Sequence, residues 1–128
     1  MAGLLLDTNI LILLIGEKPL PAAQKRAISA PGAQLVVSVA SLWEIAIKSR
    51  LGKLTLRFPA EALGDFVEGI GAALLVIDAR HAVTAAEPEP PTRDPFDRLL
   101  LAQAQVEDLR LVTLDRALAG HPLAWRKD

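Results

Sequence analysis

Four short apolar runs, separated by longer stretches with helical patterning, constrain the fold of this chain more than any other feature. Short apolar runs of this kind are typical of buried strands, and their alternation with helices is typical of parallel sheets covered on both faces. We therefore predict a three-layer α/β/α fold with a mostly parallel central sheet of four to five strands flanked by helices. The predicted strands are 4–7, 35–37, 74–77 and 109–113, with a short edge strand at 123–125.

Capping residues and helix breakers predict the helices. Ser38, Asp78 and Asp94 can each cap a helix, and Pro95 suits a first helical turn. Gly52 suits the position just after a helix end. These signals predict helices over 9–16, 21–29, 39–51, 59–69, 79–86, 95–107 and 115–120.

The composition narrows the class of protein. The chain has 128 residues, of which 52% are hydrophobic, and therefore suits one folded domain over 1–128. It contains no cysteine, which excludes disulfides and thiolate metal sites, and its formal net charge of −1 gives no sign of nucleic-acid binding. The longest apolar run, 10–15, is too short for a membrane span, and the start lacks a basic secretory signal. We therefore predict a soluble cytoplasmic protein.

Two acids follow apolar strands. Asp7 ends the first strand and Asp115 comes just after the fourth, and the carboxyl ends of parallel strands meet at the edge where such sheets bind ligands. Thr113 can donate its hydroxyl group to a carboxylate, and Asn9 can brace the turn that follows Asp7. A simple helix cap is the alternative interpretation of both acids, and the sequence leaves it open.

Two further acids lie in predicted helices. Glu44 has mostly apolar neighbours, although an exposed ion pair with Lys48 at i,i+4 is an alternative explanation. Asp97 lies in a first helical turn whose apolar residues suggest that it faces the sheet, whereas capping alone explains Asp94. We therefore assign Asp97 to function and Asp94 to structure.

A cluster of these acids predicts a metal site. Two carboxylates at about 4 Å repel by about 4 kcal/mol at an effective dielectric constant near 20, so such a cluster must protonate, stay open to water or hold a cation. His81 and His121 lack partners at metal-ligand spacing and are interpreted as structural. Oxygen ligands without cysteine or paired histidine favour Mg²⁺ or Mn²⁺, and the chemistry that fits is phosphodiester hydrolysis. The candidate acids are Asp7, Glu44, Asp97 and Asp115.

Four motifs, in order along nearly the whole chain, resemble those of the PIN-domain family, and specifically its VapC-type ribonuclease toxins. The motifs are Leu6-Asp7-Thr8-Asn9, Ser41 to Lys48 with Leu51 to Leu54, Arg93 to Arg98 with Leu99 to Ala104, and Leu111 to Asp115. The resemblance implies a catalytic metal site made by Asp7, Asp97, Asp115 and Glu44, the last directly or through water, with Asn9 and Thr113 in support. Many relatives have histidine where this chain has Thr92, which puts a histidine contact with substrate in doubt.

The same resemblance implies a function and partners. It implies a Mg²⁺-dependent endoribonuclease, with Mn²⁺ as an alternative cation, that acts as the toxin of a type II toxin–antitoxin pair. It also implies a homodimer and a cognate antitoxin. The segment 10–15 is apolar on every side of the predicted helix, so one side can pack on the sheet while the other must be buried elsewhere. A partner chain or the second predicted helix could bury that other side.

Two other functions are compatible with parts of the sequence. A haloacid-dehalogenase-like phosphatase would use Asp7 as its nucleophile, but that chemistry usually has a second aspartate two residues later, where this chain has Asn9. A non-catalytic binding module with a PIN fold would keep the architecture without the chemistry. It predicts no stabilisation by Mn²⁺, whereas a working metal site predicts stabilisation.

Overall fold

The computed structural model describes residues 2–127 and contains a four-stranded sheet in which all strand pairs are parallel. The strands are β1 (Gly3–Leu6), β2 (Leu35–Ser38), β3 (Ala73–Leu75) and β4 (Leu109–Val112), in the order β3-β2-β1-β4. The chain moves outward from β1 to β3 and then returns to the other side of β1 with β4. This reversal makes a topological switch point between β1 and β4, at whose carboxyl end ligands bind in open α/β sheets.

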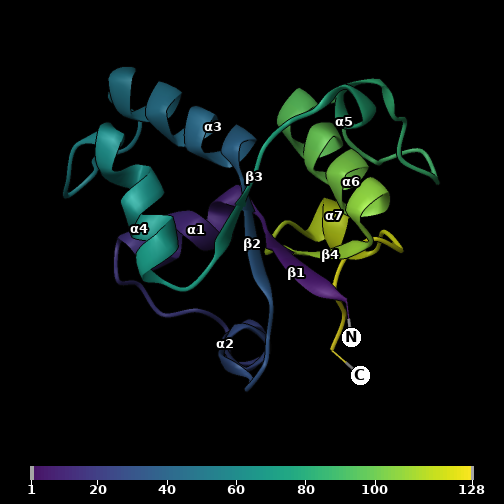
Figure 1. Cartoon of the computed structure of the whole chain (residues 1–128), viewed down its shortest axis with the longest axis horizontal. Helices are drawn as coiled ribbons and strands as arrows, with labels where there is room; N and C mark the ends of the chain where they lie inside the picture. The colour runs from purple at the N-terminus through teal and green to yellow at the C-terminus, as the bar shows by residue number, and fades with distance from the viewer. Residues whose placement is uncertain (1, 128) are drawn as a thin grey trace.

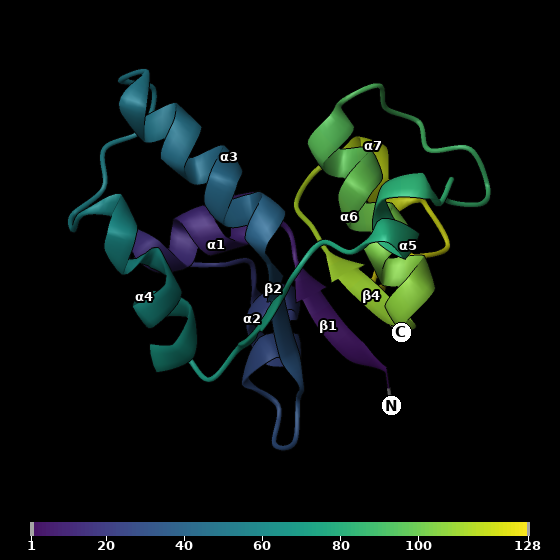
Figure 2. The same cartoon turned by 45° about the horizontal axis from the view of Figure 1, so that its top comes forward.

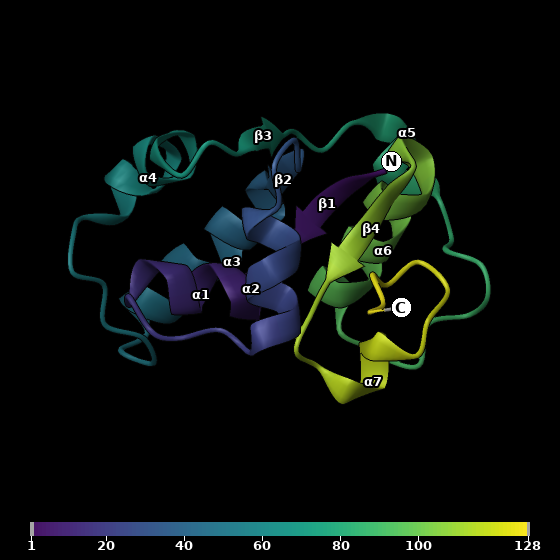
Figure 3. The same ribbon diagram turned by 90° about the horizontal axis from the view of Figure 1, so that it is seen from below.

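Helices cover both faces of this sheet. Figure 1 shows α1, α3 and α4 on one side of the strands and α5, α6 and α7 on the other, and the same grouping is visible in the tilted view of Figure 2 and from below in Figure 3. No described helix has the length and apolar character needed to cross a membrane. The helices are α1 (Thr8–Ile15), α2 (Ala22–Ser29), α3 (Val39–Arg50), the 3₁₀ helix η1 (Ala60–Ala62), α4 (Leu63–Gly69), α5 (Ala79–Val83), α6 (Pro95–Glu107) and α7 (Arg116–Ala119).

The apolar run of β1 is buried on both faces, as expected for a strand inside a covered parallel sheet. Leu4 and Leu6 belong to one core cluster, which includes residues of α1, α3 and α4. Leu5 points the other way and belongs to a second cluster with residues of α6 and α7. Each fully buried leucine stabilises the fold by about 1.5–3 kcal/mol, so these two cores fix β1, and with it the residue that follows, firmly in place.

The predicted caps are confirmed. The Ser38 hydroxyl accepts a hydrogen bond from the Ala40 amide at 3.0 Å and so begins α3. The Asp94 carboxylate accepts one from the Phe96 amide at 2.8 Å at the start of α6. Gly52 has a φ of +73°, a conformation that favours glycine after a helix end.

Several predicted boundaries were wrong. The third strand was predicted over 74–77, but β3 ends at Leu75 because its partner there, Ser38, already caps α3 and leaves no further strand to pair with. The helix predicted over 79–86 ends at Val83, and Thr84 is extended. The predicted edge strand at 123–125 is reduced to one isolated bridge between Leu111 and Ala124.

Two further predicted boundaries, one strand end and one helix start, also shift. The first strand ends at Leu6, and Asp7 is already the residue that caps α1. The helix predicted from Pro59 begins as the 3₁₀ helix η1 before it continues as α4. Both changes leave the order of elements as predicted.

Candidate active site

A pocket of about 170 Å³ lies at the carboxyl end of β1, where the switch point is expected to bind ligands. All four acids singled out from the sequence line it, although they come from four separate segments of the chain. Asn9 lines it too, as predicted. The complete lining is Asp7, Thr8, Asn9, Ile12, Glu44, Lys48, Asp94, Asp97 and Asp115.

Asp7 lies at the base of the pocket and is only 3% exposed. One carboxylate oxygen accepts a hydrogen bond from the Thr8 amide at 2.8 Å, and the other accepts one from the Thr113 hydroxyl at 2.6 Å. Burial raises the pKa of Asp7, the two hydrogen bonds oppose this rise, and the negative charges of Glu44 and Asp115 add to it. Asp7 therefore caps α1 and at the same time lines the pocket with a carboxylate whose ionised form is disfavoured by burial.

Thr113 connects the acids at the two sides of the switch point. Besides donating to Asp7, its hydroxyl oxygen accepts a hydrogen bond from the Asp115 amide at 3.0 Å. One Asp115 oxygen caps α7 by accepting from the Ala117 amide at 2.9 Å, and the residue still lines the pocket. The predicted hydroxyl donation by Thr113 is confirmed, and the capping alternative for Asp115 is also present. Asn9 was predicted to brace the turn that follows Asp7, but its side-chain oxygen instead accepts from the Leu114 amide at 3.4 Å, in the turn that follows β4.

Asp97 projects from the first turn of α6 into a negative environment. Burial, followed by the charge of Asp94 and then by that of Asp7, raises the pKa of Asp97 to about 6. The Thr92 hydroxyl lies 3.4 Å from an Asp97 oxygen, so the residue that replaces the histidine of many relatives contacts this acid. Asp94 was assigned to structure alone. It does cap α6, but it also lines the pocket, so that assignment was incomplete.

Glu44 shares the pocket with Lys48, which was predicted only as its exposed ion-pair partner at i,i+4. The Lys48 ammonium lies 3.0 Å from a Glu44 oxygen, and the side chains are 42% and 15% exposed, respectively. The i,i+4 pair is therefore real, yet both residues line the pocket. The spacing of one helical turn from Glu44 is the signal that could have placed Lys48 at the site.

Thr8 and Ile12 were not predicted as lining residues. The Thr8 hydroxyl donates to the Ser41 hydroxyl at 2.9 Å, and both residues are buried, so this bond fixes α1 against α3 beneath the pocket. Thr8 belongs to the opening motif, and its position beside Asp7 was the available signal. Ile12 gives no sequence signal beyond its spacing one turn after Thr8.

The pocket acids do not form a closed cage. Among residues 2–127, the one group of three Asp, Glu or His side chains whose ligand atoms all lie within 4.8 Å of one another is elsewhere, at Asp78, His81 and Glu107. A wider arrangement suits Mg²⁺, which usually keeps several waters and takes only one or two carboxylates.

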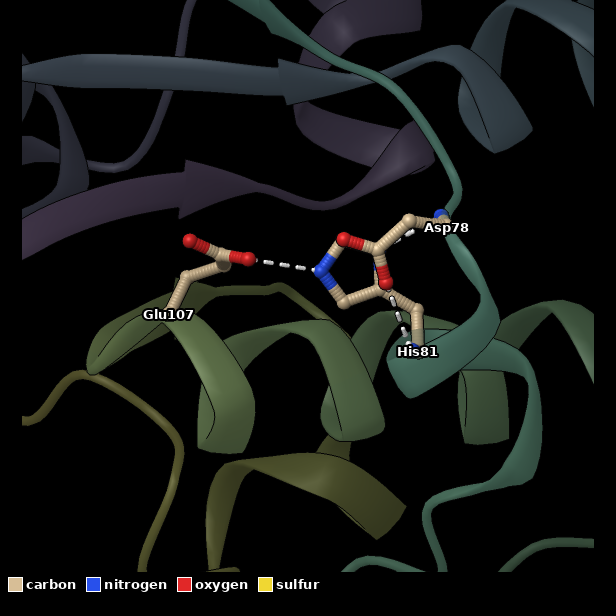
Figure 4. Close-up of side chains that lie close together, drawn as sticks. All are labelled: Asp78, His81 and Glu107. Atoms are coloured by element: carbon tan, nitrogen blue, oxygen red, sulfur yellow. Dashed lines mark hydrogen bonds and ion pairs between the residues drawn. The ribbon is translucent and has the colours of Figure 1, made fainter.

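The cluster of Asp78, His81 and Glu107, shown in Figure 4, connects α5 to α6. His81 is buried, and its Nε2 lies 2.7 Å from a Glu107 oxygen, while its Nδ1 accepts from the Asp78 amide at 3.0 Å. The Arg80 guanidinium lies 3.2 Å from an oxygen of each acid and offsets their charge. The prediction that His81 lacks partners at metal-ligand spacing was wrong, because Asp78 and Glu107 lie at that spacing. Both ring nitrogens are nevertheless engaged within the protein, as a structural role of His81 requires.

We expect His81→Ala to lower the free energy of unfolding by about 2–4 kcal/mol, because it empties a buried site and leaves the capping box of α5 without its partner. Urea denaturation measures this change. The activity of the folded variant should match that of the wild type well below its melting temperature. A specific loss of activity in folded His81→Ala would contradict a purely structural role.

His121 is also held by backbone groups. Its Nε2 lies 2.8 Å from the Pro88 carbonyl oxygen, and its Nδ1 accepts from the Leu123 amide at 3.1 Å. It therefore fastens the loop that precedes α6 to the C-terminal segment, in agreement with the structural interpretation.

The sequence profile of the PIN domain family matches residues 4–121, which spans all four acidic motifs. The chain belongs to the PIN domain family. A search of curated protein sequences gave no match for this PIN domain.

Two solved structures share the fold over nearly its full length. A toxin–antitoxin complex from Klebsiella pneumoniae matches with a TM-score of 0.65 and 23% identity, covering 98% of this chain and 97% of the other. DNA-bound VapBC from Salmonella typhimurium matches with a TM-score of 0.63 and 21% identity, covering 97% and 96%. At these identities the likeness establishes the PIN fold.

Proposed function

We propose that this PIN domain is a metal-dependent endoribonuclease and acts as the VapC-type toxin of a toxin–antitoxin pair. The observation that carries the proposal is the meeting of four separate acidic motifs in one pocket at the switch point of the sheet. Burial, with a further contribution from neighbouring acids, raises the pKa of both Asp7 and Asp97, so a bound cation would stabilise their ionised forms. Membership of the PIN family and the likeness to toxin–antitoxin complexes agree with this proposal.

The donor set fits a hard divalent cation. The acids offer only oxygen ligands, and the described pocket includes no histidine or sulfur ligand. Asp7 and Asp97 would bind Mg²⁺ or Mn²⁺, and Glu44 would bind it directly or through a water molecule. Asp115 would be the fourth acid of the metal site. When bound, the cation would stabilise negative charge on a phosphate and lower the pKa of a water molecule.

The other polar groups of the pocket keep the acids in place. Thr113 holds Asp7 by its hydroxyl group and Asp115 by the backbone, so these two acids keep a fixed separation. Lys48 forms an ion pair with Glu44, and its partly exposed ammonium group at the pocket wall can also contact an RNA phosphate. Asp115 is more exposed than Asp7 and can accept a proton from attacking water.

An apolar groove beside the pocket supports the antitoxin part of the proposal. A cavity of about 420 Å³ is lined by Ile12, Leu13, Leu54 and Leu56, and Ile12 also lines the acidic pocket. We propose that a cognate antitoxin covers this groove, which would explain the apolar character of α1. The toxin is further expected to act as a homodimer.

RNA cleavage by the purified protein tests the proposed function. We expect the wild type to cut an unstructured RNA with Mg²⁺ or Mn²⁺ and to stop when EDTA is in excess. Trapping of phosphate on Asp7, seen by mass spectrometry, would instead support a phosphatase. Cleavage that continues undiminished in EDTA would overturn the metal-dependent mechanism.

A further inference from the structure

An exposed tryptophan lies beside the acidic pocket and belongs to neither of the two hydrophobic core clusters. The side chain of Trp43 is 60% exposed, although tryptophan is usually largely buried. It is the only exposed aromatic residue in the part of the chain that the structure describes. The other tryptophan, Trp125, packs against the core.

Trp43 is supported by a second aromatic ring from the opposite wall of the pocket. Its ring centroid lies 5.7 Å from that of Phe96, with an angle of 65° between the planes, which is an edge-to-face pair. Trp43 precedes Glu44 in α3, and Phe96 precedes Asp97 in α6, and these two acids line the pocket. The aromatic pair therefore bridges the two helices that carry the acids.

The geometry of α3 places Trp43 on the rim of the pocket. Successive helical residues differ by about 100°, so Trp43 points outward when Glu44 points into the pocket and Ile45 into the core. The amide of Phe96 donates to the Asp94 carboxylate at 2.8 Å, which holds its backbone at the start of α6, and its side chain packs against the second core cluster. One edge-to-face contact leaves at least one face of the indole free to stack.

We propose that Trp43 is a stacking platform for an unpaired base of the RNA, next to the phosphate that is cut. This proposal rests on the proposed ribonuclease function and adds a residue outside the acidic motif positions that would position the RNA. Bases in a duplex stack on one another and cannot reach a protein ring, whereas unpaired bases commonly stack on aromatic side chains. The acids would then receive the phosphate beside a base that is already held in place.

Steady-state cleavage of a short unstructured RNA tests the platform. We expect Trp43→Ala to raise KM at least about fivefold, within the 5- to 150-fold range of a lost base stack, while Trp43→Phe stays near the wild type. The matched control is Leu51→Ala, because Leu51 is 63% exposed at the end of the same helix and lies outside the pocket. The same RNA annealed to its complement should be cut poorly by every variant.

A binding measurement separates failure of the platform from failure of the ribonuclease proposal. In a Trp125→Phe background, Trp43 is the single tryptophan, and its fluorescence should be quenched when the RNA is added with Ca²⁺. Quenching of Trp43 fluorescence by RNA, without cleavage of RNA by the wild type, would overturn the proposed ribonuclease activity but support base stacking on Trp43. Cleavage with an unchanged KM in Trp43→Ala would overturn the platform alone. A change in sedimentation of Trp43→Ala, together with no quenching by RNA in the single-tryptophan protein, would assign Trp43 to a contact between copies and overturn the proposal.

Discussion

Asp7→Asn should abolish RNA cleavage and leave the fold intact. We expect the rate to fall by about 10³-fold or more, because the proposed site loses several kcal/mol of electrostatic stabilisation at its most buried ligand. The asparagine oxygen can still cap α1 through the Thr8 amide, and its amide group can donate to the Thr113 hydroxyl. Cleavage of an unstructured RNA with Mn²⁺, measured beside a thermal melt, gives both results.

The stability of this variant distinguishes a site carboxylate from a structural one. Burial raises the pKa of Asp7, so the ionised group costs stability at neutral pH, and its removal should leave the melting temperature equal or higher. Asp65→Asn is the matched control, because Asp65 is an exposed acid in α4 outside the pocket. Full activity in Asp7→Asn, or a large loss in Asp65→Asn, would contradict the assignment.

Mn²⁺ should raise the melting temperature of the wild type, most strongly at neutral to mildly alkaline pH. A ligand at 100 times its Kd adds about 2.7 kcal/mol of stability, which corresponds to roughly 10 °C for a domain of this size. Protons compete with the cation for the carboxylates, and the pKa of Asp97 is about 6. The shift should therefore be large at pH 7.5 and small at pH 5.

The metal-free protein should show the opposite trend with pH. The pKa of Asp97 in the folded state, about 6, lies above the ordinary value of 3.8, so the folded protein binds this proton more tightly than the unfolded chain. Stability contributed by this group is greatest at low pH and is lost as the pH rises through about 6. Asp97→Asn should weaken both trends, and an equal Mn²⁺ shift in that variant would exclude Asp97 as a ligand.

Local sequence signals were sufficient for the order of elements and for most helix starts. Ser38 and Asp94 were predicted as caps because their side chains can satisfy a free amide, and both do so. The end of β3 could not be predicted, because Leu75 is followed by the equally apolar Val76. The strand ends there only because its neighbour β2 has turned into a helix, which is a property of the sheet.

The candidate site was predictable in its residues but not in its contacts. Asp7 and Asp115 were each assigned either to a cap or to the site, and the structure shows that one carboxylate oxygen can cap while the residue lines the pocket. The spacing of one helical turn from Glu44 was a local signal for Lys48, whereas the inclusion of Asp94 depends on how α6 is placed against the sheet, which no local pattern indicates. The resemblance to PIN toxins pointed to the four motifs along the chain. That their acids line one pocket could be seen only from the folded structure.

A crystal soaked in Mn²⁺ tests the central claim most directly, because anomalous scattering locates the cation without reference to activity. We expect an anomalous peak between the carboxylates of Asp7 and Asp97. A peak at Asp78, His81 and Glu107 with none in the pocket, from crystals of protein that cuts RNA, would contradict it.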